Sequence, residues 1–390
     1  MKIASRVNQV PPYLFVQISR KIAEKKAQGV DVISFGIGDP DLATPREILD
    51  GLFDASEIQG NHRYPETEGL PEFRVAVAEW YKDRFGIQFD PEKEVLSLIG
   101  AKEGIGHAAL SFVEPRDIAL VPDPGYPVYS VGTLFAGGES HFLPLNSENN
   151  WLPDFSKIPD EISKKATVLW INYPNNPTGA IADLEFFEDV VKFAKKNDIA
   201  VMHDNCYSEV TFDGYKPPSF FEVDGSKDIG LEFHSLSKTY NMTGWRIGMV
   251  VGNPDLIEAL MIVKSNLDSG VSQAIQNMGI AALKLPEQYI SDRNKIYQKR
   301  RDSIIEVLTS IGLEVEKTKA SLYIWAKIPE GFTSGELCEI VLDQTGIVFT
   351  PGLGYGANGE GYVRLSITID DSDLQSALDR LNDWTPPWNI

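Results

Sequence analysis

The sequence is poor in cysteine, in long apolar runs and in positive charge. Its 390 residues include only two cysteines, Cys206 and Cys338, too few for a disulfide framework, so we expect a protein of the reducing cytoplasm. No apolar stretch approaches the roughly 20 residues that span a bilayer, and the N-terminus lacks the pattern of a signal peptide. The formal net charge of −20 argues against nucleic acid or membrane as a partner, although local arginines can still hold a small anion.

Metal ligands are also scarce. The five histidines are scattered, with no HExxH pattern. His203 and Cys206 resemble half of a zinc site, but no second pair completes it, so we expect no metal. With 43% hydrophobic and 24% charged residues, the chain is long enough to bury one large core or two moderate ones.

Short apolar runs alternate with helical patterns between about residues 95 and 251, which is typical of α/β proteins. Most of these runs contain few polar residues, as expected of strands covered on both faces. They are VLSLI (95–99), IALVP (118–122), VLWINY (168–173), IAVMHD (199–204), LEFHSL (231–236) and IGMVVG (247–252). We therefore predict a large domain, residues 41–280, on a mostly parallel sheet.

A smaller α+β domain is predicted at 281–390, where long helical patterns precede the short strands LYIWAKI and YVRLSITI. An N-terminal arm, residues 1–40, is expected to complete it. Helices are predicted at 14–28, 44–56 and 71–85. Thr44, Pro45 and Glu47 predict that the second of these begins with a capping box and a proline at the first helical position.

Polar and aromatic side chains follow four of the predicted strands at their carboxyl ends, where open α/β sheets bind ligands. They are Tyr126, Asn176, Asp204 with Tyr207, and the group Ser235, Ser237, Lys238 and Arg246. Each has an ordinary explanation when taken alone, such as packing, a rigid turn or a helix cap. Their convergence on one edge of the sheet indicates a site.

The chemistry of that edge suits a phosphorylated carbonyl compound. Two serines and Arg246 can bind phosphate, because a guanidinium holds phosphate oxygens in two places. The segment IGAKEGIGH (99–107) runs from a strand into a helix, whose first N–H groups can also face a phosphate. Lys238, close to a buried acid, could form a Schiff base with a carbonyl cofactor.

The ordered set of these residues, ending with Arg364 in GYVRLSI, resembles the fold-type I, pyridoxal 5′-phosphate-dependent aminotransferases of class I/II. The segment SLSKxxxxxGxR is specific to them. The segments PPYLF, GIGDPD, NHRYP, IGAKEGI, DPGYPVY, NYPNNPTGA and FHSLSKTYNMTGWRIG are similar to those of bacterial LL-diaminopimelate aminotransferases. The resemblance implies a seven-stranded, mostly parallel sheet in the large domain.

The resemblance also implies a role for each matching residue. Lys238 would hold pyridoxal phosphate as a Schiff base and shuttle a proton, while Asp204 would pair with the pyridinium nitrogen. Tyr207 and Asn176 would donate hydrogen bonds to the oxygen on the ring. The remaining cofactor contacts would be Tyr126 stacked on the ring and Tyr64, Ala101, Lys102, Ser235, Ser237 and Arg246 around the phosphate. Tyr64 would reach the partner subunit's phosphate, which implies a homodimer with shared active sites.

Arg364 would bind the α-carboxylate of the amino-acid or 2-oxo-acid substrate in bidentate fashion. The other substrate contacts implied are Tyr13, Gly38, Lys102, Tyr126 and Asn176.

The reaction implied is transamination of LL-2,6-diaminopimelate with 2-oxoglutarate, giving tetrahydrodipicolinate and glutamate in lysine biosynthesis. Two positions depart from the family pattern: Thr67 replaces a glutamate that binds the distal ammonium, and Gly270 replaces an asparagine. Glu66 or Glu68 is a candidate substitute for the missing glutamate. The alternatives are an aminotransferase for alanine, aspartate, glutamate or an aromatic amino acid, a carbon–sulfur β-lyase, and a protein of this fold that serves only as a regulator or binding partner.

Overall fold

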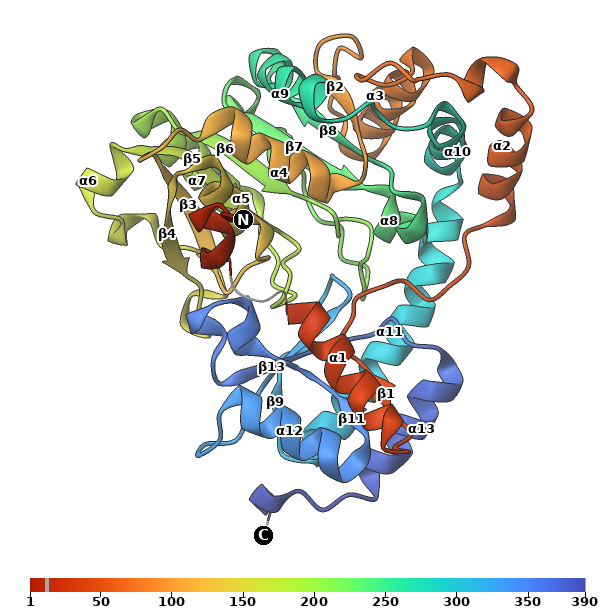
Figure 1. Cartoon of the computed structure of the whole chain (residues 1–390), viewed down its shortest axis with the longest axis vertical. Coiled ribbons are helices and arrows are strands. Elements are labelled where there is room, and N and C mark those ends of the chain that lie inside the picture. The colour runs from red at the N-terminus through yellow and green to blue at the C-terminus, as the bar shows by residue number, and fades with distance from the viewer. Residues whose placement is uncertain (11–13, 390) are drawn as a thin grey trace.

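The computed structural model describes residues 1–10 and 14–389 and shows a large upper part above a smaller lower part (Figure 1). The upper part is built on a seven-stranded sheet in the order β2-β8-β7-β6-β5-β3-β4. The strands are β2 (Val95–Leu98), β3 (Ile118–Asp123), β4 (Glu139–Pro144), β5 (Ala166–Ile171), β6 (Ala200–Asp204), β7 (Gly230–Ser235) and β8 (Gly248–Gly252). Strand β8 is antiparallel to both neighbours and the other pairs are parallel, so the predicted mostly parallel sheet is confirmed.

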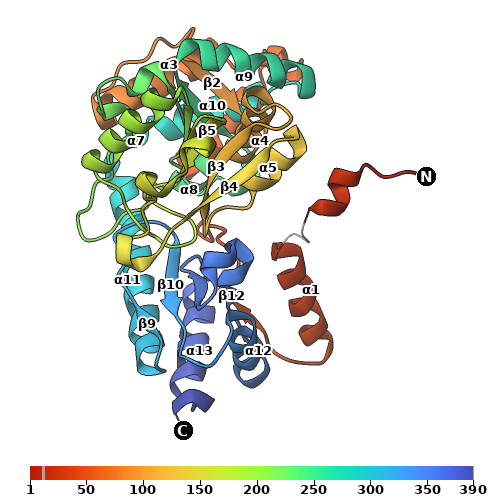
Figure 2. The same cartoon turned by 90° about the vertical axis from the view of Figure 1, so that its left-hand side faces the viewer.

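Helices cover both faces of this sheet (Figure 2). Helices α4, α5 and α9 pack together on one face, while α3, α7 and α10 lie on the other. The helices of the upper part are α2 (Arg46–Ser56), α3 (Pro71–Phe85), α4 (Ala101–Phe112), α5 (Val128–Ala136), α6 (Asp160–Ser163), α7 (Leu184–Asn197), α8 (Leu236–Thr239), α9 (Pro254–Leu267) and α10 (Gln273–Leu283). Because both faces are covered, every residue of β2, β3, β7 and β8 is buried.

The lower part contains a four-stranded sheet in the order β12-β13-β10-β9. Its strands are β9 (Glu314–Val315), β10 (Tyr323–Lys327), β12 (Thr350–Pro351) and β13 (Tyr362–Ser366), and its helices are α12 (Ser334–Thr345) and α13 (Asp371–Asn382). Helix α11 (Glu287–Ser310) runs from the upper part down into the lower part (Figure 1). Within the described residues, no helix is both long and apolar enough to cross a bilayer.

The N-terminal segment joins the lower part. Helix α1 (Leu14–Ala27) packs against α12 through ion pairs from Lys21 to Glu339 (2.7 Å) and from Lys25 to Asp343 (2.6 Å). Strand β1 (Ile33–Ser34) pairs in parallel with β11 (Ile347–Val348). Residues 1–9 instead extend away from the rest of the chain and bury no side chain (Figure 2).

Two local features differ from the sequence-based expectation. Strand β4 was not among the predicted runs, because as an edge strand it leaves most of its residues at least partly exposed and therefore lacks an apolar run. The prediction of a capping box at Thr44 is wrong. Helix α2 begins after Pro45 with no side-chain cap, and the Thr44 hydroxyl donates to the Asn241 carbonyl oxygen (2.6 Å) while accepting from the Trp245 indole (3.1 Å).

A charged pair is buried inside the large sheet. The Glu232 carboxylate on β7 lies 2.9 Å from His203 Nδ1 on β6, and both side chains are fully buried. His203 Nε2 lies 3.1 Å from the Tyr173 carbonyl oxygen, which can only accept a hydrogen bond. Both ring nitrogens therefore donate, so His203 is an imidazolium facing an ionised carboxylate. This ion pair and the other hydrogen bonds to Glu232 hold the pKa of the carboxyl group below its usual value despite burial.

Candidate active site

The carboxyl ends of β3, β5, β6 and β7 meet at the edge of the large sheet that faces the lower part (Figure 1). Most of the site residues predicted from the sequence lie on the segments that leave these strands or at the start of α4. The exceptions are Tyr13, Gly38, Tyr64 and Arg364. Parallel strands therefore bring together residues that are more than 100 positions apart in the chain.

Lys238 lies in the four-residue helix α8, directly after β7. Ser235 caps this helix by accepting a hydrogen bond from the Ser237 backbone N–H at 3.2 Å. The Lys238 ammonium donates to the Gly38 carbonyl oxygen at 2.6 Å. The predicted Schiff-base lysine is thus in contact with a residue predicted to contact substrate.

Arg293 on α11 supports the backbone around Lys238. This guanidinium is 3% exposed and donates to the carbonyl oxygens of Lys238 (2.8 Å), Thr239 and Glu209. Burial lowers the Arg293 pKa from its usual value. The carbonyl groups at the end of a short helix lack partners within that helix, so one buried cation fixes both the lysine segment and the segment after β6.

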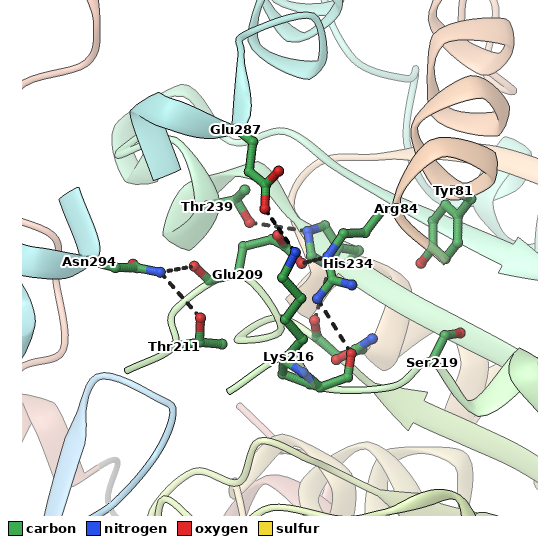
Figure 3. A network of polar contacts seen from close by, with 12 residues as sticks. Tyr81, Arg84, Glu209, Thr211, Lys216, Ser219, His234, Thr239, Glu287 and Asn294 are labelled. Carbon is green, nitrogen blue, oxygen red and sulfur yellow. Dashed lines mark hydrogen bonds and ion pairs between the residues drawn. The ribbon is translucent and has the colours of Figure 1, made fainter. Parts of the chain in front are cut away.

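The segment after β6 is held from two further sides (Figure 3). Arg84 on α3 donates to the Glu209 carboxylate at 2.9 Å, and Asn294 on α11 donates to the Glu209 carbonyl oxygen at 3.0 Å. Asn294 also reaches the Thr211 hydroxyl at 3.4 Å. Tyr207 therefore lies on a backbone that two helices hold in place.

Asp204 is the last residue of β6 and is 5% exposed. Its carboxylate accepts hydrogen bonds from the Tyr129 hydroxyl (2.7 Å) and the Cys206 backbone N–H (3.4 Å). Burial, followed by the nearby Asp204 charge, raises the Tyr129 pKa well above its usual value, so Tyr129 stays a donor. Among the described residues, Asp204 forms no ion pair with a lysine, arginine or histidine side chain. A buried carboxylate without a counter-ion is costly, so this one is suited to a cationic ligand.

Arg364 on β13 is fully buried and meets Asn176 across the boundary between the two parts. One Arg364 nitrogen donates to the Asn176 side-chain oxygen (3.0 Å), and the other terminal nitrogen donates to the Gly36 carbonyl oxygen (2.7 Å). Because the Asn176 oxygen already accepts, the amide N–H₂ group is the side that can donate to a ligand. Asn172 shapes the turn by binding the Asn176 backbone N–H (2.8 Å) and the Asp204 carbonyl oxygen (2.7 Å).

Tyr207 faces a tyrosine that the sequence did not single out. Its hydroxyl lies 3.0 Å from the hydroxyl of Tyr323 on β10, and the Tyr323 ring lies 4.0 Å from the Arg364 guanidinium. Burial, followed by Tyr323, raises the pKa of Tyr207 well above its usual value. Gly38 lies against the same ring, because a Cβ atom there would be 2.2 Å from the Tyr323 hydroxyl.

The predicted phosphate contacts gather at the start of α4. Gly100 precedes this helix at φ 74°, and a Cβ atom there would lie 2.5 Å from an Arg246 terminal nitrogen. Arg246 donates to the Ser237 hydroxyl (3.5 Å) and to the Thr243 carbonyl oxygen (2.8 Å). Ala101, the first helical residue, presents one of the N–H groups that have no partner within the helix. Lys102 follows it, with its ammonium 5.8 Å from the centre of the Tyr126 ring.

A charged cluster supports this end of α4. Glu103 accepts from the Ile99 backbone N–H (2.9 Å), and its other oxygen lies 2.6 Å from His107 Nδ1. The buried Lys264 ammonium contacts Glu103 (3.3 Å) and Asp268 (3.0 Å). Glu103, His107 and Asp268 are the residue types that bind metals, but the lysine already supplies a positive charge between the two carboxylates.

The predicted residues outside this edge have different positions. Tyr64 is 87% exposed and Tyr13 lies outside the described residues. The two departures from the family pattern lie next to each other: Gly270 adopts φ 82°, and a Cβ atom there would be 3.2 Å from the Thr67 Cα atom and 3.0 Å from the Glu66 carbonyl oxygen. An asparagine at 270 would therefore require this loop to move.

The residues present fit pyridoxal phosphate. The two serines, Arg246 and the start of α4 form a donor set for a phosphate, and Gly100 lets Arg246 approach the helix start, because a Cβ atom there would meet the guanidinium. Asp204 has no ion-pair partner among the side chains that the structure describes, and it suits a protonated pyridine nitrogen. Four supporting residues, Tyr129, Asn172, Arg293 and Tyr323, were missed. Tyr323 lies inside the predicted strand LYIWAKI and Tyr129 lies seven positions after the predicted strand IALVP, and an aromatic side chain at such a position is usually interpreted as part of the core.

Comparison with known proteins agrees with this geometry. Residues 30–381 match the family aminotransferase class I and II. The chain is 59% identical to an LL-diaminopimelate aminotransferase of Dehalococcoides mccartyi and 52% identical to one of Moorella thermoacetica, each match covering 98% of both chains. It is also similar in structure to apo-BacF from Bacillus subtilis, with a TM-score of 0.95, 36% identity and full coverage of both chains.

Proposed function

This chain belongs to the class I and II aminotransferases, and from that membership we propose that it transfers an amino group from LL-2,6-diaminopimelate to 2-oxoglutarate. The products are tetrahydrodipicolinate and glutamate, which is a step of lysine biosynthesis. The enzyme is pyridoxal phosphate-dependent. The observation that carries the proposal is a buried arginine of the lower part, Arg364, which bonds to Asn176 on the sheet edge that also carries Lys238 and Asp204, since an amino-acid substrate needs both a carboxylate site and an amine-reactive site.

When bound, pyridoxal phosphate supplies an electron sink that makes the Cα–H bond of an amino acid acidic. Lys238 Nζ would hold the cofactor and, once released by substrate, would accept the Cα proton and return it. Asp204 would keep the pyridine nitrogen protonated. The Asn176 amide and the Tyr207 hydroxyl would donate to the ring oxygen. Ala101, Lys102, Ser235, Ser237 and Arg246 would bind the phosphate, and Tyr126 would stack on the ring.

Arg364 would hold the α-carboxylate of each substrate in turn. Its two bonds, to the Asn176 oxygen and the Gly36 carbonyl, fix the plane of the guanidinium. A fixed plane suits bidentate binding, because two parallel N–H groups must meet two carboxylate oxygens. Gly38, Tyr126, Asn176, Lys102 and Tyr13 would line the rest of the substrate site.

Glu66 is a better candidate than Glu68 to bind the distal ammonium of diaminopimelate. Its side chain is exposed beside Thr67, in the loop that also carries Tyr64. Glu68 instead lines a separate groove with Arg74 and Met261, and that groove contains none of the predicted site residues. We therefore expect Glu66→Gln to raise the KM for diaminopimelate roughly tenfold, as for a hydrogen bond to a charged group. Glu68→Gln is the matched control and leaves this KM unchanged.

A homodimer is part of the proposal. Tyr64 is 87% exposed, so its own chain leaves the side chain uncovered, and the N-terminal residues Ile3 and Val7 present apolar surface on a segment that projects from the body (Figure 2). A second copy would bring Tyr64 to the neighbouring phosphate site and cover this arm. A cytoplasmic location is proposed because neither cysteine forms a disulfide.

One assay tests the substrate. Purified protein with pyridoxal phosphate is supplied with 2-oxoglutarate and, separately, with LL-diaminopimelate, alanine, aspartate or an aromatic amino acid. We expect the fastest glutamate formation with diaminopimelate. The departures at Thr67 and Gly270 make transamination of another amino acid the second candidate. Activity on the other donors without activity on diaminopimelate would establish that candidate instead.

A further inference from the structure

Tyr323 connects three parts of the active site. It lies on β10 in the lower part and is 4% exposed. Its hydroxyl is 3.0 Å from the Tyr207 hydroxyl, its ring lies 4.0 Å from the Arg364 guanidinium, and Gly38 leaves room for its hydroxyl. One side chain therefore touches a predicted proton donor of the cofactor, the predicted carboxylate site and the predicted substrate pocket.

The direction of the bond between the two hydroxyls follows from counting protons. Each hydroxyl has one proton to donate and can also accept. If Tyr207 donates to Tyr323, it has no proton left for the oxygen of the cofactor ring. In the proposed function Tyr207 donates to that oxygen, so Tyr323 must donate to Tyr207. A hydroxyl that accepts one hydrogen bond donates the next one more strongly.

We propose that Tyr323 is a positioning residue of this enzyme: its hydroxyl orients and polarises the Tyr207 hydroxyl, and its ring packs against the Arg364 guanidinium and holds it in place. The proposal rests on the roles given above to Tyr207 and Arg364. The two contacts use different parts of the side chain. Substitutions can therefore remove the hydroxyl contact and the ring contact separately. If the side chain only filled the core, a substitution would affect the protein only through the volume that it removes.

Tyr323→Phe removes the hydroxyl and keeps the ring. Weaker donation by Tyr207 leaves more negative charge on the ring oxygen, which favours protonated Lys238 Nζ in the cofactor-bound protein. The midpoint of the pH-dependent change in visible absorbance should therefore rise by about half to one pH unit, the size expected of one neutral hydrogen bond. The KM for the amino acid and the melting temperature should change little.

Tyr323→Leu removes the ring as well. Loss of the surface under Arg364 should raise the KM for both the amino acid and the 2-oxo acid about tenfold, because a desolvated cation–aromatic contact is lost. Tyr173→Phe is the matched control: Tyr173 is also buried, and its hydroxyl donates to the Trp151 carbonyl oxygen (2.7 Å), outside the active site. This control should leave both the absorbance midpoint and the KM values at their wild-type values.

Among the described residues, Asp204 and Cys206 are charged or titratable groups that act on Tyr207, and Arg364 lies against the Tyr323 ring. None of them changes in these variants, so a shifted midpoint reports on the hydroxyl. If wild-type protein shows no cofactor absorbance band, the proposed function fails and this inference fails with it. If the wild type binds cofactor but Tyr323→Phe keeps the wild-type midpoint, the positioning role is refuted while the aminotransferase remains.

Discussion

Replacing Glu232 with glutamine would remove the negative half of the ion pair buried inside the large sheet. The carboxylate accepts from His203 Nδ1 (2.9 Å), from the hydroxyls of Tyr81 and Ser219 (each 3.0 Å at the closest) and from the Phe220 backbone N–H (3.1 Å). Glutamine keeps the size of the side chain but leaves the imidazolium of His203 without a counter-ion. In addition, the glutamine N–H₂ group would replace one carboxylate oxygen and would face hydrogen-bond donors that this oxygen now accepts from.

The expected cost is about 3–5 kcal/mol of unfolding free energy, the usual consequence of removing one member of a buried ion pair. The way this contribution to the unfolding free energy varies with pH follows from the direction of the Glu232 pKa shift. Because the folded pKa of Glu232 is lowered, its stabilisation is complete above the unfolded value, about 4.3, and is lost as the pH falls through the folded pKa. The difference in unfolding free energy between wild type and Glu232→Gln should therefore become smaller at pH values below about 4.3.

Urea unfolding of the cofactor-free protein, followed by tryptophan fluorescence, measures this difference. The first cooperative transition is compared for wild type, Glu232→Gln, His203→Phe and the double variant. If the two residues form an ion pair, the double variant should lose less than the sum of the single losses, by about 2 kcal/mol. Additive losses, or a Glu232→Gln protein as stable as wild type, would refute the assignment of an imidazolium to His203.

Three further substitutions test the active site. Gly100→Ala should raise the dissociation constant of pyridoxal phosphate at least about tenfold in an absorbance titration, because φ 74° is strained for alanine and its Cβ atom would lie 2.5 Å from Arg246. Arg364→Lys should lower kcat/KM about 100-fold for the amino donor and the 2-oxo acid alike in steady-state assays, since an ammonium cannot replace a bidentate guanidinium; an effect on one substrate only would contradict a shared carboxylate site. Arg293→Met should lower the unfolding free energy by about 3 kcal/mol in urea because three backbone carbonyls lose a charged donor, and a wild-type midpoint would contradict this.

The sequence was most informative where apolar runs are buried on both faces. All six predicted strands of the upper part were found, and the helix predicted at 71–85 matches α3. Strand β4 was missed because its exposed edge lacks such a run. At the start of α2, local chemistry predicted a cap, but the Thr44 hydroxyl instead bonds to Asn241 and Trp245, which are about 200 positions away.

The predicted site residues could be grouped because parallel strands end at one edge of a sheet. The residues that support them could not be predicted in this way. No local sequence pattern separates Tyr129, Tyr323 or Arg293 from ordinary core or surface positions. Arg293 lies in a helix rich in charged residues, and only the fold reveals that it is buried against the Lys238 carbonyl group. The neighbouring positions of Thr67 and Gly270 were likewise invisible in the sequence, where they are about 200 residues apart.

Helix α11 limits how freely this protein can be recombined with its relatives. The predicted domain boundary, near residue 280, precedes the helix and would assign all of it to the C-terminal portion. Arg293 nevertheless binds backbone next to Lys238, whereas Arg301, two turns further on, binds the Thr318 carbonyl oxygen in the lower part (2.6 Å). A chimaera joined at residue 280 would thus place the other parent's residue at position 293 against the Lys238 carbonyl group of this chain. A junction beyond Arg293 would keep that contact within one parent.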